Sequence, residues 1–173
     1  TMQSNRLGTM VALALAFAVV ALPGRADDAA PASKVRTVAL LVFNGMDIQD
    51  FAVPADVFFY ASASSGGKAI FRQFVVAKTM DPISSQGFIK ITPNVTFADC
   101  PKPDILVIPG GDVTRVMNDE ETMKWIKETG GKSEQVLSVC TGALVLQSAG
   151  FLDGQKATTH WGMAASANNR RSV

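Results

Sequence analysis

The sequence predicts an α/β domain in which a mostly parallel sheet is covered by helices on both faces. Segments that are continuously apolar and rich in β-branched residues alternate with segments of helical pattern, as in folds built on parallel strands. The apolar segments lack the polar alternation of a half-exposed strand, so both of their faces are expected to be covered. The 173 residues, of which 47% are hydrophobic, fit a single globular domain.

The predicted elements alternate along the chain. Strands are predicted over residues 35–43, 71–77, 105–108 and 135–139, with a shorter strand pair or hairpin over 84–92 and a short strand over 157–159. Helices are predicted over residues 51–61, 119–129 and 141–149. Pro54 is expected in the first turn of the first helix, and glycines follow the ends of the other two.

The first 26 residues are predicted to be a signal peptide. Arg6 supplies a positive n-region, residues 7–22 are uncharged and mostly apolar, and Ala26 ends a stretch suited to cleavage. A membrane-spanning helix needs about 20 apolar residues, so an uncleaved anchor is the weaker interpretation, as is an N-terminal core helix. We therefore expect residues 27–34 to form a linker and the protein to be exported to the periplasm or secreted, meeting the membrane only transiently.

The charge pattern gives no sign of a nucleic-acid partner. The chain has 16 basic and 15 acidic residues and a formal net charge of +1, without a basic run or stripe. Proteins that bind phosphate backbones concentrate Lys and Arg on one surface. A small-molecule partner is therefore the expectation.

Cys140 is the strongest candidate for a chemical role. It directly follows a predicted buried strand and precedes the small residues of a helix start, as a nucleophile at a strand-to-helix turn does. The helix N-terminus would lower the pKa of the thiol and favour the reactive thiolate. Two alternatives remain from local sequence alone: a buried core cysteine and a disulfide with Cys100.

Three other features accompany Cys140. The glycine pair Gly110 and Gly111 ends a strand at the same edge of the sheet, where backbone N–H groups there and at Thr141 could bind developing negative charge; a plain tight turn is the alternative. Asp50 follows the first strand and could act as acid and base, or simply cap a helix. Spacing alone does not choose it over Asp47 or Asp56.

His160 is the only histidine of the chain. A Cys–His pair would be an activated nucleophile, but a lone histidine is more often structural. With one histidine and two separated cysteines, we expect no metal site.

Taken together, these motifs resemble one known family. The motifs are 138–146 (SVCTGALVL), 149–154 (AGFLDG) and 157–161 (ATTHW), preceded by 97–111 (FADCPKPDILVIPGG) and 41–51 (LVFNGMDIQDF). Between about residues 35 and 161 the chain resembles the ThiJ/PfpI superfamily, which is class I glutamine amidotransferase-like. Within it, the resemblance is strongest to isonitrile hydratases and to the ligand domains of AraC-type regulators.

The resemblance implies a flavodoxin-like fold and assigns roles to residues. Cys140 matches the family's nucleophile, and Asp50 matches the acid that hydrogen-bonds it. Gly111 and Thr141 match the backbone donors, with Gly110 beside them, and His160 matches a motif histidine near the site.

The implied reaction is that of a lyase, in which water adds to a small isonitrile to give an N-substituted formamide. No cofactor is implied, and the full-length protein is expected to be a homodimer. The alternatives are a hydrolase, a glyoxalase, a redox sensor, and a truncated sensor domain of an AraC-type transcription regulator.

The chain departs from the family pattern at its C-terminal end. Family domains continue beyond the position of Trp161, and residues 164–173 do not resemble that continuation. We therefore expect the domain, 35–173, to be incomplete, with the C-terminal part of the sandwich missing.

Overall fold

The computed structural model describes residues 34–66 and 68–164. The predicted signal peptide and nearly all of the linker lie outside these residues, as does the tail from residue 165 onward. No helix within the described ranges has the length and apolar character needed to cross a bilayer.

The core of the domain is a five-stranded sheet in which every pair of neighbours is parallel. Its order is β5-β2-β1-β6-β7, formed by β5 (Val95–Thr96), β2 (Phe71–Ala77), β1 (Arg36–Leu41), β6 (Ile105–Ile108) and β7 (Gln135–Ser138). The four predicted strands of this sheet are confirmed to within two residues. Strand β5 was not predicted, since two residues are too short for a periodic pattern.

A separate antiparallel hairpin lies between β2 and β5 in the sequence. It consists of β3 (Ile83–Ser85) and β4 (Ile89–Ile91), as the sequence predicts for this segment. Ser84 N donates to the side-chain oxygen of Asn44 at 2.7 Å, and Gly45 N donates to Ser84 O at 2.8 Å. The hairpin is thereby fixed to the turn that follows β1.

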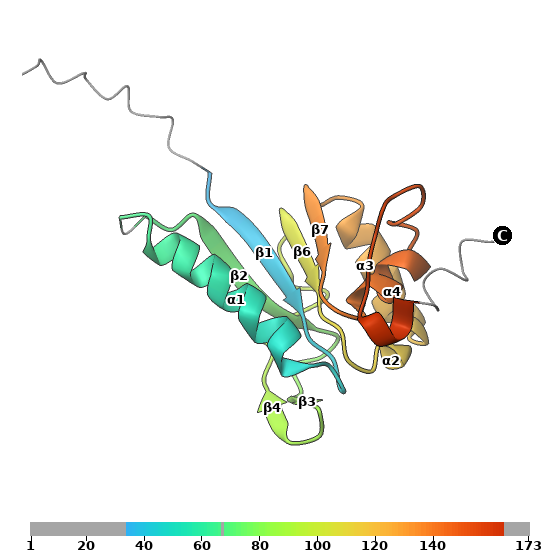
Figure 1. Cartoon of the computed structure of the whole chain (residues 1–173). Helices are drawn as coiled ribbons and strands as arrows, with labels where there is room; N and C mark the ends of the chain where they lie inside the picture. The colour runs from blue at the N-terminus through green and yellow to red at the C-terminus, as the bar shows by residue number, and fades with distance from the viewer. Residues whose placement is uncertain (1–33, 67, 165–173) are drawn as a thin grey trace, which may run out of the picture. The chain divides into compact units, whose positions relative to one another are not determined.

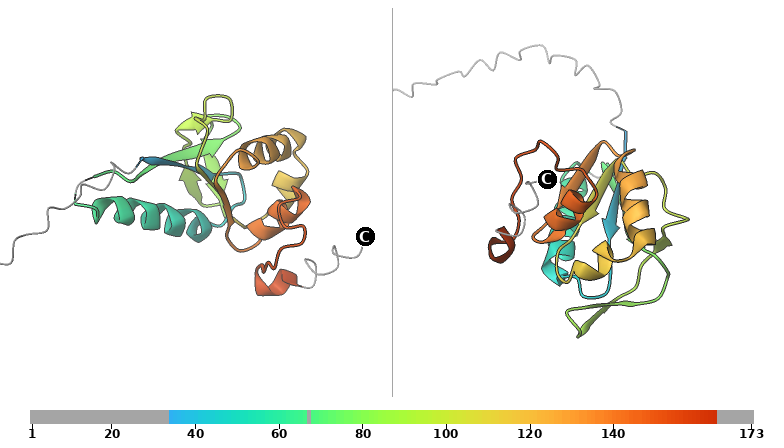
Figure 2. Two further views of the ribbon diagram at one scale, coloured as in Figure 1. Left: turned by 90° about the horizontal axis from the view of Figure 1, so that it is seen from above. Right: turned by 90° about the vertical axis from the view of Figure 1, so that its right-hand side faces the viewer.

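Helices cover both faces of the parallel sheet, as predicted (Figures 1 and 2). On one face lies α1 (Ile48–Ala63), whose Phe51, Ala55 and Phe58 pack on β1 and β6. On the other face lie α2 (Thr114–Met117), α3 (Glu120–Gly130) and α4 (Gly142–Ser148). The flavodoxin-like α/β fold implied by the family resemblance is therefore confirmed for the described residues.

The strand order reverses at β1. The chain runs from β1 outward to β2 and then returns to β6 on the other side of β1. In open parallel sheets, sites form where the order reverses, at the carboxyl ends of the strands. The segments that follow β1, β6 and β7 carry Asp50, Gly110 and Cys140, so the topology brings all three to one region.

Two local predictions are wrong. Helix α1 begins at Ile48, three residues earlier than predicted, because Asp47 caps it by accepting from Gln49 N at 2.9 Å. Pro54 therefore lies beyond the first turn. The short strand over 157–159 does not form: these residues have irregular backbone, and a 3₁₀ turn over Trp161–Met163 follows them.

Candidate active site

Cys140 occupies a strained turn between β7 and α4. Its φ is +54°, a left-handed conformation that costs a non-glycine residue about 1–2 kcal/mol. The turn is also tight: a Cβ added at Gly142 would lie 2.3 Å from the carbonyl oxygen of Ile108. The sharp strand-to-helix turn expected of a nucleophile is therefore present.

Asp50 is the acid that the fold brings to Cys140. Helix α1 carries it in its first turn, where Asp47 already serves as the cap, so Asp50 is not needed for capping. One carboxyl oxygen of Asp50 accepts from Gly110 N at 3.1 Å, and the carboxyl lies close enough to the Cys140 thiol for each group to shift the pKa of the other. Asp56 is exposed, farther along the helix. Sequence spacing did not distinguish Asp50 from Asp47 and Asp56. The geometry of helix α1 does, because it places Asp50 beside Cys140.

The electrostatics of this pair favour a neutral thiol. Burial is the largest cause that raises the pKa of Cys140, and the charge and hydrogen bond of Asp50 raise it further. The Thr141 N–H and hydroxyl act in the opposite direction. The expectation that the helix start would lower the pKa of the thiol is therefore wrong, because burial and a neighbouring carboxylate outweigh a helix of seven residues.

The pKa of Asp50 is also raised. Burial is again the largest cause, and the charge of Asp47 adds to it. The Gly110 N–H, the Cys140 thiol and the charge of His160 partly offset these causes. A thiol and a carboxyl whose pKa values are both raised therefore lie side by side, which is an arrangement that permits proton transfer between them.

The glycine pair after β6 brings the backbone close to this site. A Cβ on Gly110 would lie 2.7 Å from Thr141 N and 2.8 Å from the bonded oxygen of Asp50, so only glycine fits. Gly111 N donates to the Thr141 hydroxyl oxygen at 2.9 Å, and that hydroxyl donates to Gly111 O at 3.0 Å. The predicted role of Gly111 and Thr141 as oxyanion donors stays a prediction, and it requires the Thr141 hydroxyl to turn away.

His160 lies near the pair without bonding to it. The Thr159 hydroxyl donates to Cys140 O at 3.0 Å, which holds this segment against the turn. His160 Nδ1 accepts from Gly162 N at 3.2 Å. The electrostatic interaction with His160 lowers the pKa of Asp50. Among the described residues, no hydrogen bond joins His160 to Cys140 or Asp50. The position of His160 fits an electrostatic role better than that of a base.

The two cysteines are separate. Both Cys100 and Cys140 are free thiols, so the disulfide alternative is wrong for this structure. Cys100 is partly buried against the core beside α3, and burial raises its pKa to about 11. Only Cys140 has a carboxyl partner.

Thr159 and the capping role of Asp47 were missed in the sequence analysis. Each acts by a local hydrogen bond whose partner depends on the fold. The only available signals were that Thr159 directly precedes the motif histidine and that Asp47 precedes an apolar helical pattern.

The described residues form an α/β domain in which a cysteine on a strand-to-helix turn lies beside a carboxyl group at the carboxyl edge of a parallel sheet. A family model described as the DJ-1/PfpI family matches residues 36–172. The chain belongs to this family.

The similar proteins include an enzyme and a regulator. The isonitrile hydratase of Pseudomonas putida is 43% identical over 88 residues, which are 50% of this chain and 39% of that protein. The crystal structure of a ThiJ/PfpI family protein from Pseudomonas syringae has a TM-score of 0.67 and 32% identity, covering 84% of this chain and 60% of that one. An AraC family transcriptional regulator from Pseudomonas putida has a TM-score of 0.63 at 20% identity, covering 78% and 72%.

The chain matches only part of the length of two of these proteins. The chain spans less than two thirds of the length of the isonitrile hydratase and of the Pseudomonas syringae protein. The similarity to the regulator, at 20% identity, shows a shared fold.

Proposed function

We propose that the chain carries the site of a cysteine-dependent lyase that hydrates small isonitriles to N-substituted formamides. The observation that supports this most is the close interaction of the Cys140 thiol with the Asp50 carboxyl, two groups whose pKa values are both raised. This pair can deliver a nucleophile and a proton to the same carbon atom. The partial 43% identity to an isonitrile hydratase supports the substrate class.

The first half of the reaction forms a thioimidate. The Cys140 proton passes to the Asp50 carboxylate as the sulfur attacks the terminal carbon of R–N≡C, forming a carbon–sulfur bond. Asp50 then gives the same proton to that carbon, which yields R–N=CH–S–Cys140. No oxidant is needed, because the carbon receives one nucleophile and one proton.

The second half releases the product. Asp50 accepts a proton from water as the oxygen attacks the thioimidate carbon, and Asp50 passes this proton to the nitrogen. The carbon–sulfur bond then breaks as the hydroxyl oxygen of the adduct loses its proton, which returns through Asp50 to the Cys140 sulfur, and R–NH–CHO leaves. One water is consumed for each isonitrile, and both residues return to their initial states.

Turnover of a simple alkyl isonitrile tests the proposal. Formation of the N-substituted formamide would be followed by NMR with the full chain. We expect Cys140→Ser to abolish turnover and Asp50→Asn to reduce it about 10²–10⁴-fold, since Asp50 moves the proton. Cys100→Ser is the matched control and should keep full activity. The proposal fails if the intact chain, with a Cys140 that reacts with an alkylating reagent, forms no formamide.

Other activities of the same site give different results in this assay. A hydrolase or glyoxalase would turn over amides, peptides or methylglyoxal through Cys140 and leave the isonitrile unchanged. A redox sensor would oxidise at Cys140 and consume no substrate. A sensor domain of an AraC-type regulator would bind its ligand without converting it.

We also propose that the chain is exported and cleaved after Ala26. The n-region, the apolar run and the small residues before the cleavage point support this. N-terminal sequencing of the protein from a cell that expresses the whole gene is the test. A mature N-terminus at Asp27 is expected, and retention of residues 1–26 on a cytoplasmic protein would contradict export.

A further inference from the structure

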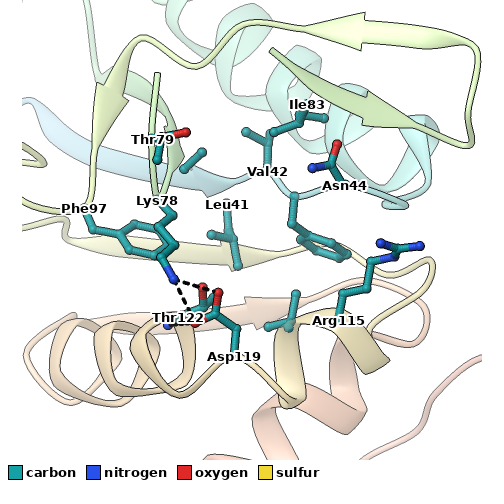
Figure 3. Close-up of a pocket in the computed structure, with 13 residues that line it drawn as sticks. Leu41, Val42, Asn44, Lys78, Thr79, Ile83, Phe97, Arg115, Asp119 and Thr122 are labelled. Atoms are coloured by element: carbon teal, nitrogen blue, oxygen red, sulfur yellow. Dashed lines mark hydrogen bonds and ion pairs between the residues drawn. The ribbon is translucent and has the colours of Figure 1, made fainter. Parts of the chain in front are cut away.

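A pocket that Cys140 does not line lies at the carboxyl edge of the sheet. It has a volume of about 310 Å³ and lies where β1 and β2 end, between the β3 hairpin and the helices α2 and α3 (Figure 3). None of the residues discussed above as a catalytic or backbone-donor candidate lines it. Helices α2 and α3 cover the face opposite α1, which carries Asp50.

The walls of this pocket are mainly apolar. Val42 and Val116 are almost fully buried, and Ile83 closes the side of the hairpin. Phe97 stacks on Trp125 with ring centroids 4.4 Å apart, so this wall is held in place. Apolar walls with a few fixed polar groups are typical of small-molecule sites, and the volume is at the lower end of their range.

One end of the pocket presents hydrogen-bond donors. The side-chain oxygen of Asn44 accepts from Ser84 N, which leaves the amide NH₂ as the available group. Arg115 uses its Nε to bond Asp112 at 3.0 Å, and its two terminal nitrogens remain to bind a ligand. Figure 3 shows Asn44 and Arg115 on the same side of the pocket.

The opposite end excludes an anion. Lys78 lies there, within 3.2 Å of both Asp119 oxygens and 2.8 Å from a Glu121 oxygen. Two carboxylates surround one ammonium group, so the local charge is negative. Within the described ranges, the carboxylate paired with Arg115 is that of Asp112, and both side chains are exposed, so solvent weakens this ion pair.

We propose that this pocket binds a small molecule with an apolar body and one carboxylate, the carboxylate lying between Arg115 and Asn44. A guanidinium binds a carboxylate through two parallel hydrogen bonds, and the weak pair with Asp112 yields to such a ligand. The apolar body lies against Val42, Ile83 and Phe97. The acidic surroundings of Lys78 fix the orientation of the ligand.

Binding of hexanoate to the full chain, measured by NMR titration, tests this assignment. Hexanamide and hexylamine are matched neutral and cationic probes. We expect hexanoate to bind at least about tenfold more tightly than either, since one charge-assisted bidentate contact separates them. Equal affinity for hexanoate and hexanamide, tighter binding of hexylamine, or no binding of hexanoate would overturn the proposal.

Variants with opposite expected effects locate the ligand. Arg115→Gln should lower the affinity for hexanoate at least tenfold. Asp112→Asn should raise this affinity several-fold, because it frees Arg115 from its ion pair. Lys124→Gln, an exposed change on α3, is the control and should leave the affinity unchanged. Cys140→Ser should also leave it unchanged, so failure of isonitrile turnover would not affect this test. If thermal unfolding shows that the Arg115→Gln variant is folded, and this variant binds hexanoate as tightly as the wild type does, the assignment is wrong.

Discussion

The chemistry of the site depends on how Cys140 and Asp50 share a proton. Because the pKa of Asp50 is raised in the fold, its stabilising contribution is fully present below the ordinary carboxyl pKa and is lost as pH rises through the folded value. The charged form of Asp50 therefore lowers the stability of the folded state at neutral pH. Such a cost is common where a buried charge serves a reaction.

The backbone at Cys140 carries a second, measurable cost. Glycine adopts φ near +54° without strain, while alanine there remains as strained as cysteine. We expect Cys140→Gly to be about 1 kcal/mol more stable than Cys140→Ala, measured by urea unfolding. Equal stabilities would mean that the turn relaxes and stores no strain.

At the scale of elements, α1 has two roles. Its first turn carries Asp50, and the cap at Asp47 sets the start of the helix so that Asp50 meets Gly110 N. Its other side exposes Val53, Val57 and Tyr60, each about 60% accessible and spaced at i, i+4 and i+7. This spacing puts the three side chains on one stripe of the helix.

We propose that this stripe of α1 contributes to a homodimer interface. Burying apolar area is the main source of affinity between protein subunits. We expect Val57→Glu to shift sedimentation toward the monomer, because a charge would be buried in the interface. Lys124→Glu, exposed on α3, is the control and should change nothing. A wild-type chain that sediments as a monomer at high concentration would contradict the proposal.

For the molecule as a whole, the strands of the parallel sheet were largely predictable, because β1 and β6 contain buried apolar runs and β2 is rich in aromatic and β-branched residues. The short elements were not: β5 and α2 have two and four residues, too few for a period to emerge. The segment 157–159 has strand-forming residues but no strand partner among the described residues. Its Thr159 bonds to Cys140 O instead. Local propensity cannot supply such a partner.

The sequence was sufficient to predict which residues form the candidate site. It was not sufficient to predict how their pKa values shift. The strand-to-helix position of Cys140 and the glycines after β6 are sequence features, while the choice of Asp50 needed the family motif or the helix geometry. The direction of the Cys140 pKa depended on burial and on a carboxylate 90 residues away in the chain. No local pattern contains that information.

The pH dependence of Cys140 alkylation tests the central pairing most directly. In a Cys100→Ser background, iodoacetamide would report on Cys140 alone. We expect the rate to keep rising above the pH at which an ordinary cysteine thiol titrates, because burial and the charge of Asp50 raise the pKa of Cys140. Asp50→Asn should move the profile to lower pH and speed alkylation at pH 7–8, because the negative charge is removed. An Asp50→Asn profile identical to that of the parent would contradict a thiol paired with this carboxyl.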